Sequence, residues 1–359
     1  MSINPLYHTW LNRIRELYPH ERITRLRNMA WLITGIAESR SIHLSKIANK
    51  LPGEATATSI VRRLSRFLDN PAVRVRRWYE PVAQNLVERV SRHQTEIRLI
   101  VDGSKVGFGH QLLMVSLAYR RRALPLVWTW VKGQRGHSSS TTQLALLAYV
   151  RGLLPSDCKV LLVGDNEFGA VPLLKQLDEW GWSYVLRQKR SHLVQSVPQT
   201  AWQPFGSLVS QMGQRAWLGS ALLTQHWAYS VNLVAYWQVG EKEPWLLATN
   251  LPALPLAVAA YRRRMWIEEM FGDFKRHGFD LESTHLRHFR RLSRLTLAVA
   301  FLYVWLVAYG SFVIKTGQRY LVDRSDRRDL SLFRIGFDMI QRRLVRALSI
   351  SVTFSLYFT

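Results

Sequence analysis

Two short apolar runs of the chain each lead directly into an aspartate, and this pair constrains the fold more than any other feature. The first run, IRLIVDGS, contains Asp102, and the second, KVLLVGDNEFG, contains Asp165. Both have the length and apolar character of buried strands that end in an aspartate and a turn. Because helical segments separate such runs, the pattern predicts a mixed sheet with helices packed on it, and hence an α/β fold.

The sequence around these runs supports the prediction. LLMVSLAYRRRALPLVWTWVKG has the pattern of two strands joined by a basic turn at Arg120, Arg121 and Arg122. QLALLAYVRGLL and AVPLLKQLDEWG have helical periodicity, and WSYVLRQK has the pattern of a further strand. We therefore expect a strand hairpin followed by strand–helix–strand units.

Changes in periodicity divide the chain into three parts. Residues 1–93 have helical periodicity, and residues 94–310 contain the predicted sheet. Within this second part, residues 190–255 alternate in the manner of strands and are interrupted by Gly and Pro, which predicts a β-rich insertion. The sequence is mostly helical again after residue 256, and we assign residues 311–359 to a helical C-terminal region.

The net charge predicts a polyanionic partner. The chain has 49 Lys and Arg residues against 25 Asp and Glu residues, a formal charge of +24. Nucleic acid is the commonest polyanion, and we favour it over a ribosome or an anionic membrane surface. Near the N-terminus, a short helix, a break at Pro52 and Gly53, and a helix with Arg62, Arg63 and Arg66 give a helix-turn-helix-like outline. A plain helical bundle has a similar pattern, but the charge favours DNA binding.

Two features bear on the compartment. Residues 296–314 are almost free of polar side chains and approach the length that spans a bilayer. They have no companion spans and follow Arg290, Arg291 and Arg294, so we predict a helix buried in a large soluble domain, with no membrane partner. The single cysteine, Cys158, excludes an internal disulfide framework and is typical of the reducing cytoplasm.

The two aspartates are candidate metal ligands. Side chains at strand ends of α/β domains face a crevice, where functional groups gather. An aspartate after one strand is unremarkable, because turns favour Asp. Asp102 and Asp165 together indicate a metal site, since Mg²⁺ requires carboxylate oxygens.

A third carboxylate lies in the segment YRRRMWIEEMFGDFK. If this segment is one α-helix, then Tyr261, Arg264, Glu268 and Lys275 fall within an arc of roughly 60°. Glu269 lies outside that arc, so Glu268 is the carboxylate placed among the cations. An ordinary solvated stripe of Glu–Arg pairs has the same spacing. The mixture of a carboxylate, two cations and a phenol instead favours a site that binds phosphate beside a metal ion.

The Tyr-x2-Arg-x3-Glu-x6-Lys spacing, met in full from Tyr261 to Lys275, resembles the signature of bacterial insertion-sequence DDE transposases related to the Tn-five transposase. The segment MFGDFKRHGFDLESTHLRHFRRLSRL is similar to the stretch after the glutamate in that group. VDGS around Asp102 and VGDNEFG around Asp165 also agree, in the order Asp, Asp, Glu. One departure is the Asn166-Glu167 pair after the second aspartate, where a basic or small residue is expected.

The resemblance implies a ribonuclease-H-like catalytic domain at residues 94–310 and a DNA-binding region at residues 1–93. Asp102, Asp165 and Glu268 would be the catalytic, metal-binding triad for two Mg²⁺ or Mn²⁺ ions. Tyr261, Arg264 and Lys275 would hold phosphates of the transposon end, and the β-rich stretch would be the insertion that this group places before the glutamate.

The resemblance further implies cut-and-paste transposition on double-stranded DNA, by a homodimer that joins transposon ends to a target and whose interface could be formed by the C-terminal helices. A hairpin intermediate would require a base to be held outside the stack on an aromatic ring. Any of five tryptophans in the predicted insertion could provide this ring: Trp202, Trp217, Trp227, Trp237 and Trp245.

Two other functions remain open on the sequence. A metal-dependent nuclease of the same fold would cut DNA without joining it. A non-catalytic DNA-binding protein derived from a transposase would need no triad.

Overall fold

A single mixed sheet organises the molecule, for which we describe a computed structural model covering residues 4–107, 109–133, 138–196 and 200–358. Within these residues the sheet has ten strands, in the order β3-β2-β1-β4-β5-β10-β9-β8-β6-β7. The first five strands are β1 (Glu96–Val106), β2 (His110–Tyr119), β3 (Arg122–Lys132), β4 (Lys159–Gly164) and β5 (Ser183–Arg187).

The polarity of these five strands defines the fold. β1, β2 and β3 are antiparallel neighbours, as expected for the hairpin with its basic turn. β4 is parallel to β1, and β5 is parallel to β4. Helices α6 (Ser140–Arg151) and α7 (Val171–Glu179) provide the crossover connections that parallel strands require. This strand order and polarity is that of a ribonuclease-H-like sheet, so the predicted α/β fold class is confirmed.

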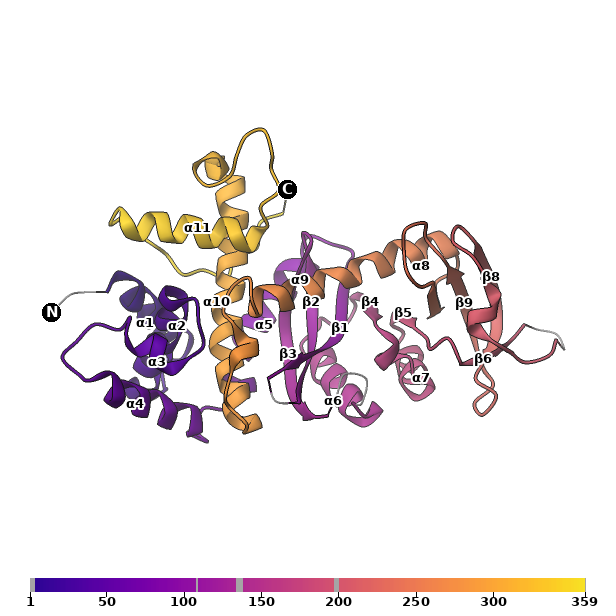
Figure 1. Cartoon of the computed structure of the whole chain (residues 1–359), viewed down its shortest axis with the longest axis horizontal. Coiled ribbons are helices and arrows are strands. Elements are labelled where there is room, and N and C mark those ends of the chain that lie inside the picture. Colours follow the sequence, from indigo (N-terminus) through magenta and orange to yellow (C-terminus); the bar gives the residue numbers. More distant parts are fainter. Residues whose placement is uncertain (1–3, 108, 134–137, 197–199, 359) are drawn as a thin grey trace.

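The β-rich stretch extends the same sheet instead of forming a separate one. It comprises β6 (Leu193–Gln195), β7 (Gln203–Pro204), β8 (Arg215–Leu223), β9 (Tyr229–Tyr236) and β10 (Trp245–Thr249). β10 pairs antiparallel with β5, through Leu247 opposite Arg187, and thereby joins the two halves. In Figure 1 this stretch lies at the far end of the molecule from the N-terminal helices.

Five helices precede the sheet: α1 (Pro5–Leu17), α2 (Ile23–Ser39), α3 (Leu44–Ala48), α4 (Ala57–Asp69) and α5 (Val75–Ser91). α4 buries one apolar face and leaves Arg62 and Arg66 exposed, with Arg63 partly buried. The break at Pro52 and Gly53 is not the tight turn of a helix-turn-helix outline, because residues 49–56 separate α3 from α4, and a helix-turn-helix connection has about 3–4 residues. Helix α4, which carries these arginines, lies on the other side of α10 from the sheet that carries Asp102 and Asp165 (Figure 1).

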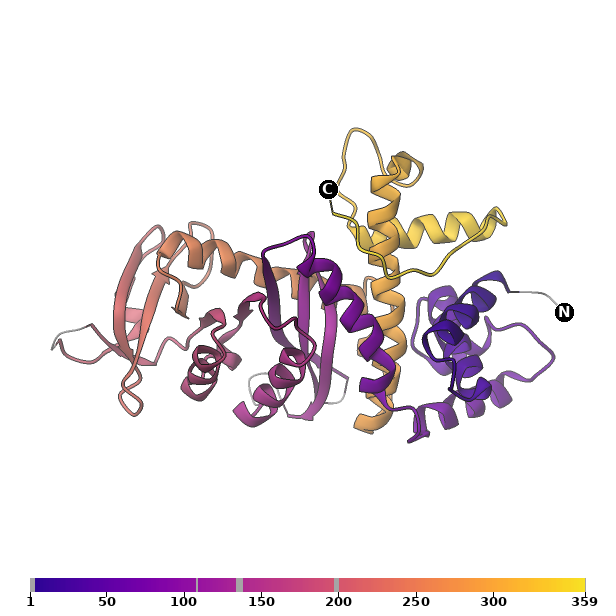
Figure 2. The same cartoon turned by 180° about the vertical axis from the view of Figure 1, so that it is seen from behind.

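The long apolar segment forms α10 (Phe289–Lys315), which runs between the N-terminal helices and the sheet (Figures 1 and 2). It is the one helix of the described residues that is long and apolar enough to cross a membrane, and 89% of its most apolar window is buried inside the protein. Arg294 on α10 is also buried and donates hydrogen bonds to the carbonyl oxygens of Val73 at 3.0 Å and Leu68 at 2.8 Å. The helix therefore has the burial expected of a core element that ties the N-terminal helices to the sheet.

Helix α11 (Leu332–Val345) crosses α10 at a backbone-to-backbone contact. A Cβ atom added at Gly310 of α10 would overlap the carbonyl oxygen of Leu332, and one added at Gly336 of α11 would overlap that of Leu306. Glycine is thus required on both helices at this crossing, because backbone atoms cannot move aside as the end of a flexible side chain can.

We expect Gly310→Ala and Gly336→Ala each to lower the free energy of unfolding, by about 1–3 kcal/mol, because the added methyl forces the two helices apart. Chemical denaturation measures the change. Gly152→Ala is the matched control, since a Cβ at Gly152 would meet its nearest neighbour at an ordinary 3.4 Å. Unchanged stability in both crossing variants would contradict the close approach.

Candidate active site

Strand register brings Asp102 and Asp165 to the same place on the sheet. The last residue pair between β1 and β4 is Val101 with Gly164. Asp102 and Asp165 each follow a member of that pair, on neighbouring parallel strands that lie about 4.8 Å apart. A Cβ atom at Gly164 would come within 2.8 Å of the Val101 side chain, so glycine permits this close pairing.

Asp102 lies within β1 and not at its end. The expected turn after Asp102 was wrong, because β1 continues to Val106 by pairing with β2 after its pairing with β4 has stopped. The carboxylate is 1% exposed, and its Oδ1 accepts a hydrogen bond from the Gly103 amide at 2.7 Å. A Cβ at Gly103 would overlap the terminal amide of the buried Gln111, so a larger residue next to Asp102 would displace that side chain from Glu167.

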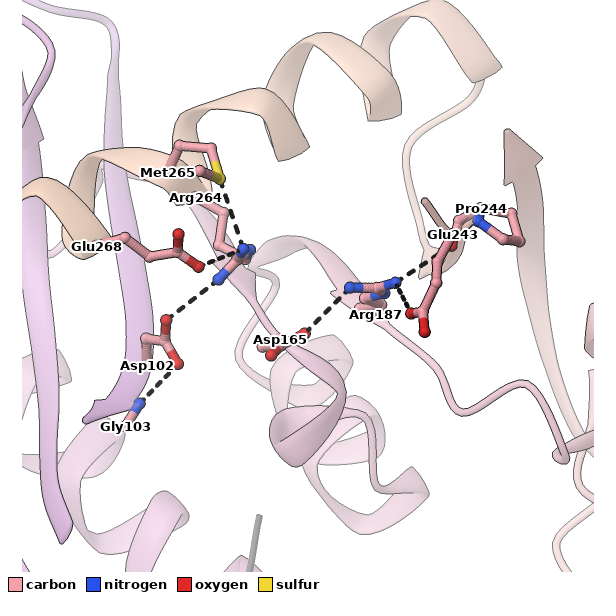
Figure 3. A network of polar contacts seen from close by, with 9 residues as sticks. All are labelled: Asp102, Gly103, Asp165, Arg187, Glu243, Pro244, Arg264, Met265 and Glu268. Atoms are coloured by element: carbon pink, nitrogen blue, oxygen red, sulfur yellow. Dashed lines mark hydrogen bonds and ion pairs between the residues drawn. The ribbon is translucent and has the colours of Figure 1, made fainter. Parts of the chain in front are cut away.

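Asp165 directly follows β4, as the sequence predicts, and precedes the short 3₁₀ helix η1 (Asn166–Phe168). Its Oδ1 lies 3.9 Å from a guanidinium nitrogen of Arg187, the last residue of β5. The other guanidinium nitrogen of Arg187 lies 3.1 Å from Glu243, in the loop before β10. Arg187 thereby links the second aspartate to the β-rich stretch (Figure 3).

The segment that carries Glu268 is not one continuous α-helix. α8 (Leu254–Tyr261) is followed by a 3₁₀ turn, η3 (Arg262–Arg264), and then by α9 (Met265–Phe274). The continuous α-helix predicted from Tyr261 to Lys275 is therefore wrong. Tyr261 and Arg264 still share one side, because side chains three residues apart eclipse in a 3₁₀ turn, whereas Lys275 lies beyond the end of α9. The turn coincides with three successive arginines, of which only Arg264 is buried.

A buried guanidinium joins two of the three predicted carboxylates. Arg264 Nη1 lies 3.2 Å from Asp102 Oδ2, and Arg264 Nη2 lies 2.6 Å from Glu268 Oε1 (Figure 3). Burial by itself would lower the pKa of Arg264, but Tyr261, Asp102 and Glu268 outweigh it and raise the pKa above its ordinary value. Arg264 is thus firmly cationic and lies between the carboxylates of β1 and α9.

These carboxylates lie within the part of the chain that matches a known family. The family described as "Transposase DDE domain" matches residues 94–305, more than half of the chain. The chain belongs to this DDE transposase family. The match covers β1 to β10, the two aspartates and α9, so the geometry above lies within the transposase DDE domain of the chain.

Similarity to solved structures is remote. The piggyBac transposase synaptic complex with hairpin DNA is 10% identical, with 96% of this chain and 79% of that chain covered and a TM-score of 0.45. The Argonaute of Marinitoga piezophila, in complex with guide RNA and target DNA, is 9% identical, with 72% and 38% covered and a TM-score of 0.24. No curated protein matches the chain.

Members of the DDE transposase family use divalent metal, and the donor chemistry here fits such an ion. Asp102 and Glu268 already face one cation, the Arg264 guanidinium, from two sides. Carboxylate oxygens are the ligands that Mg²⁺ prefers. In the conformation of the described residues, however, no three Asp, Glu, His or Cys side chains are grouped closely enough to hold a metal ion. The three carboxylates are adjacent but do not form a closed site.

Of the two remaining residues of the predicted motif, the structure keeps Tyr261 against Arg264, whose guanidinium carbon lies 5.8 Å from the centroid of the Tyr261 ring, and places Lys275 elsewhere. The ring of Tyr261 is 2% exposed and packs edge-on against Trp245 at 5.1 Å, and burial raises the pKa of its hydroxyl. Lys275 follows the end of α9 and pairs with Glu282 at 2.8 Å. Lys275 is therefore engaged by Glu282, whereas Tyr261 contacts Arg264, the arginine that joins Asp102 and Glu268.

Sequence reasoning missed a further carboxylate beside the site. Glu167, part of the departure from the family pattern, accepts hydrogen bonds from Gln111 Nε2 at 2.8 Å and from the Ser138 amide at 3.1 Å. Gln143 donates to the Glu167 carbonyl oxygen at 3.0 Å. These neutral donors fix the loop after Asp165 to β2 and α6. The sequence signal for it was an acidic residue where a basic or small one was expected.

The opposite side of α9 holds a second buried carboxylate. Asp273 lies 3.5 Å from Arg122, which also pairs with Glu269 at 3.3 Å. Burial raises the pKa of Asp273 to about 7, although Arg122 acts to lower it and Glu269 adds to the rise. The ion pair with Arg122 acts to lower the pKa of Asp273, whereas burial acts to raise it. Burial has the larger effect on the pKa, because Asp273 is 5% exposed and shares the Arg122 guanidinium with Glu269.

We expect Asp273→Asn to become increasingly stabilising relative to the wild type as the pH rises. The unfolded carboxyl ionises near pH 4 and the folded one near pH 7, so the folded wild-type protein binds more protons between these values and loses stability as the pH rises. The stability difference between variant and wild type should grow by about 2 kcal/mol from pH 5 to pH 8. Urea denaturation at both values measures it, and a difference that does not change with pH would contradict the raised pKa.

Proposed function

We propose that this protein is a cut-and-paste transposase that binds the terminal inverted repeats of a mobile element, cleaves its ends and joins them to target DNA. Membership of the DDE transposase family supports transposition as the process. The observation that carries the finer proposal is the convergence of Asp102, Asp165 and Glu268: strand register sets the first two side by side, and Arg264 connects the third to the first.

In this proposal the three carboxylates hold two divalent ions, Mg²⁺ or Mn²⁺. Ions held in this way would activate a water molecule or a 3′-hydroxyl and stabilise the departing oxygen of an in-line displacement. The protein supplies the carboxylates on rigid elements, β1, the end of β4 and α9. Arg264, when released from Asp102 and Glu268, is placed to pair with a phosphate of the transposon end.

The remaining parts of the proposal concern DNA and assembly. The charge of +24 supports binding of double-stranded DNA, both transposon ends and target. The exposed Arg62 and Arg66, with Arg63, would contribute on α4. We propose that Tyr261 and Lys275 contact the same DNA end after rearrangement. We also propose that the chain is related to the Tn-five group and that the cleaved DNA end passes through a hairpin intermediate. A homodimer acting in the cytoplasm of a bacterium would handle two ends together.

A strand-transfer assay tests the proposal. Terminal repeats identified in the DNA that flanks the gene are supplied as pre-cleaved duplexes with a free 3′-hydroxyl, together with supercoiled target and Mg²⁺. We expect covalent joining of the ends to the target, and none with duplexes that end in a 3′-deoxy nucleotide, because the attacking hydroxyl is then missing.

The same assay separates the two other functions. Cleavage of uncut ends without joining of pre-cleaved ends would show a metal-dependent nuclease. Binding of the repeats with neither reaction would show a non-catalytic protein. Either result would contradict the proposed transposase.

A further inference from the structure

A hollow of about 900 Å³ lies beside the candidate active site, on the other side of α9. The turn between β2 and β3 borders it, as do the start of α9 and the segment from η5 (Gln318–Leu321) to the start of α11. Five arginines line it: Arg120, Arg121, Arg122, Arg319 and Arg328. Glu269 and Asp329 are the acidic residues of its lining.

The acidic residues of the hollow are already paired. Glu269 lies 3.3 Å from Arg122, and Asp329 lies 2.7 Å from Arg327, which is outside the lining. Two of the five arginines therefore remain exposed without an acidic partner within the described part of the chain, namely Arg121 and Arg328. Arg120 donates to the carbonyl oxygen of Tyr357, at 3.2 Å. The hollow thus has an excess of positive charge that the protein does not neutralise.

The turn holds two of these arginines at a conformational cost. Arg120 and Arg121 have φ angles of 44° and 64°, in the left-handed region. A two-residue hairpin turn of this kind favours Asn-Gly or Asp-Gly, because side chains other than these are strained there. Strained residues that persist in a structure cluster at functional sites, and both arginines of this turn line the hollow.

The hollow and the candidate active site share the start of α9. Met265 and Trp266 line it, and they follow directly after Arg264, whose guanidinium joins Asp102 and Glu268. Met265 is 48% exposed, so its apolar surface is accessible beside the arginines. Guanidinium groups beside exposed apolar groups suit a phosphodiester chain, which offers anionic oxygens and apolar sugar faces in alternation.

We propose that this hollow is a second DNA-binding site, which holds phosphates of the duplex DNA that extends away from the active site. Its position relative to the scissile bond rests on the proposed function. Its affinity for DNA does not, because phosphate binding requires neither metal nor catalysis. Arg121 and Arg328 make the principal phosphate contacts, and Arg120 supports them.

The test compares the salt dependence of duplex binding, without divalent metal, between the wild type and Arg121→Gln/Arg328→Gln. The probe is a fluorescent 40-base-pair DNA duplex. Each lost phosphate contact lowers the slope of log affinity against log salt by about one, so the double variant should lose about two. The matched control is Arg151→Gln/Lys159→Gln, which removes the same charge at exposed positions near the start of β4 and should keep the slope in the wild-type range.

Two further variants separate loss of the site from loss of the fold. Arg121→Lys/Arg328→Lys keeps both charges and should restore the slope. Arg121→Gly removes the charge and also the strain of the left-handed residue, so it should bind DNA less tightly while its Tm rises by a few degrees. A slope equal to that of the wild type in the glutamine double variant would overturn the second site, whatever the strand-transfer assay shows. Conversely, the double variant could show the reduced slope while the wild-type protein joins no DNA. This result would support the second site and contradict the proposed transposase activity.

Discussion

Glu268→Gln is expected to abolish metal-dependent cleavage of transposon ends, with a loss of about a thousandfold or more in rate, equivalent to about 4 kcal/mol of transition-state stabilisation. The amide keeps the shape of the side chain but removes the negative charge that a hard divalent ion requires. Binding of the terminal repeat should stay within a few-fold of the wild type, because Glu268 is an acidic residue in a basic protein. Cleavage of a labelled repeat duplex and its binding in Ca²⁺ measure the two effects.

The neighbouring carboxylate provides the control. Glu269 pairs with Arg122 on the other side of α9 and is not part of the network of Figure 3. Glu269→Gln should therefore retain cleavage. An equal loss of cleavage in both variants would mean that the substitutions act by destabilising α9. Full cleavage activity of Glu268→Gln would contradict the assignment of Glu268 to the triad.

The second large effect is expected on stability. Arg264→Met removes the guanidinium that faces Asp102, a carboxylate with 1% exposure, while it keeps an unbranched side chain. Loss of one partner of a buried ion pair lowers the free energy of unfolding by about 3–5 kcal/mol, because the other charge stays in a medium of low polarity. Denaturation in the presence of EDTA measures this loss.

A second substitution and added Mn²⁺ each test whether the unpaired carboxylate causes the loss of stability in Arg264→Met. Asp102→Asn placed in the Arg264→Met background should recover most of the lost stability, since the buried charge is then gone and the remaining carboxylate, Glu268, is 38% exposed to water. Mn²⁺ should raise the Tm of Arg264→Met more than that of the wild type, because the ion replaces a cation that the variant lacks. Wild-type stability of Arg264→Met in EDTA would contradict the role of Arg264 as the cation between these carboxylates.

The sequence predicted the elements of the fold better than their junctions. The apolar runs and their periodicity indicated β1 to β5, α6, α7 and the buried α10, since each pattern is local. The end of β1 was predicted wrongly at Asp102, because its continuation depends on pairing with β2 and not on its own residues. For the same reason, nothing in the local pattern showed that β10 joins the sheet beside β5.

The sequence indicated which residues belong to the candidate site but not which contacts they make. Helical spacing separated Glu268 from Glu269, and the structure indeed places them on different partners, Arg264 and Arg122. The pairing of Arg264 with Asp102 joins residues far apart in the sequence, and the end of α9 at Phe274 leaves Lys275 outside the helix. Arg187 and Glu167 were missed because their roles depend entirely on tertiary contacts.

Asp102, Asp165 and Glu268 are proposed to form one metal centre, although the structure holds Asp102 and Glu268 on Arg264 and Asp165 near Arg187. Mn²⁺ binding to the protein with a terminal-repeat duplex, followed by electron paramagnetic resonance, tests this central claim most directly. We predict tight Mn²⁺ binding by the wild type that is lost in Asp102→Asn, Asp165→Asn and Glu268→Gln alike and retained in Glu269→Gln. Undiminished Mn²⁺ binding in any one of the first three variants would contradict a shared centre.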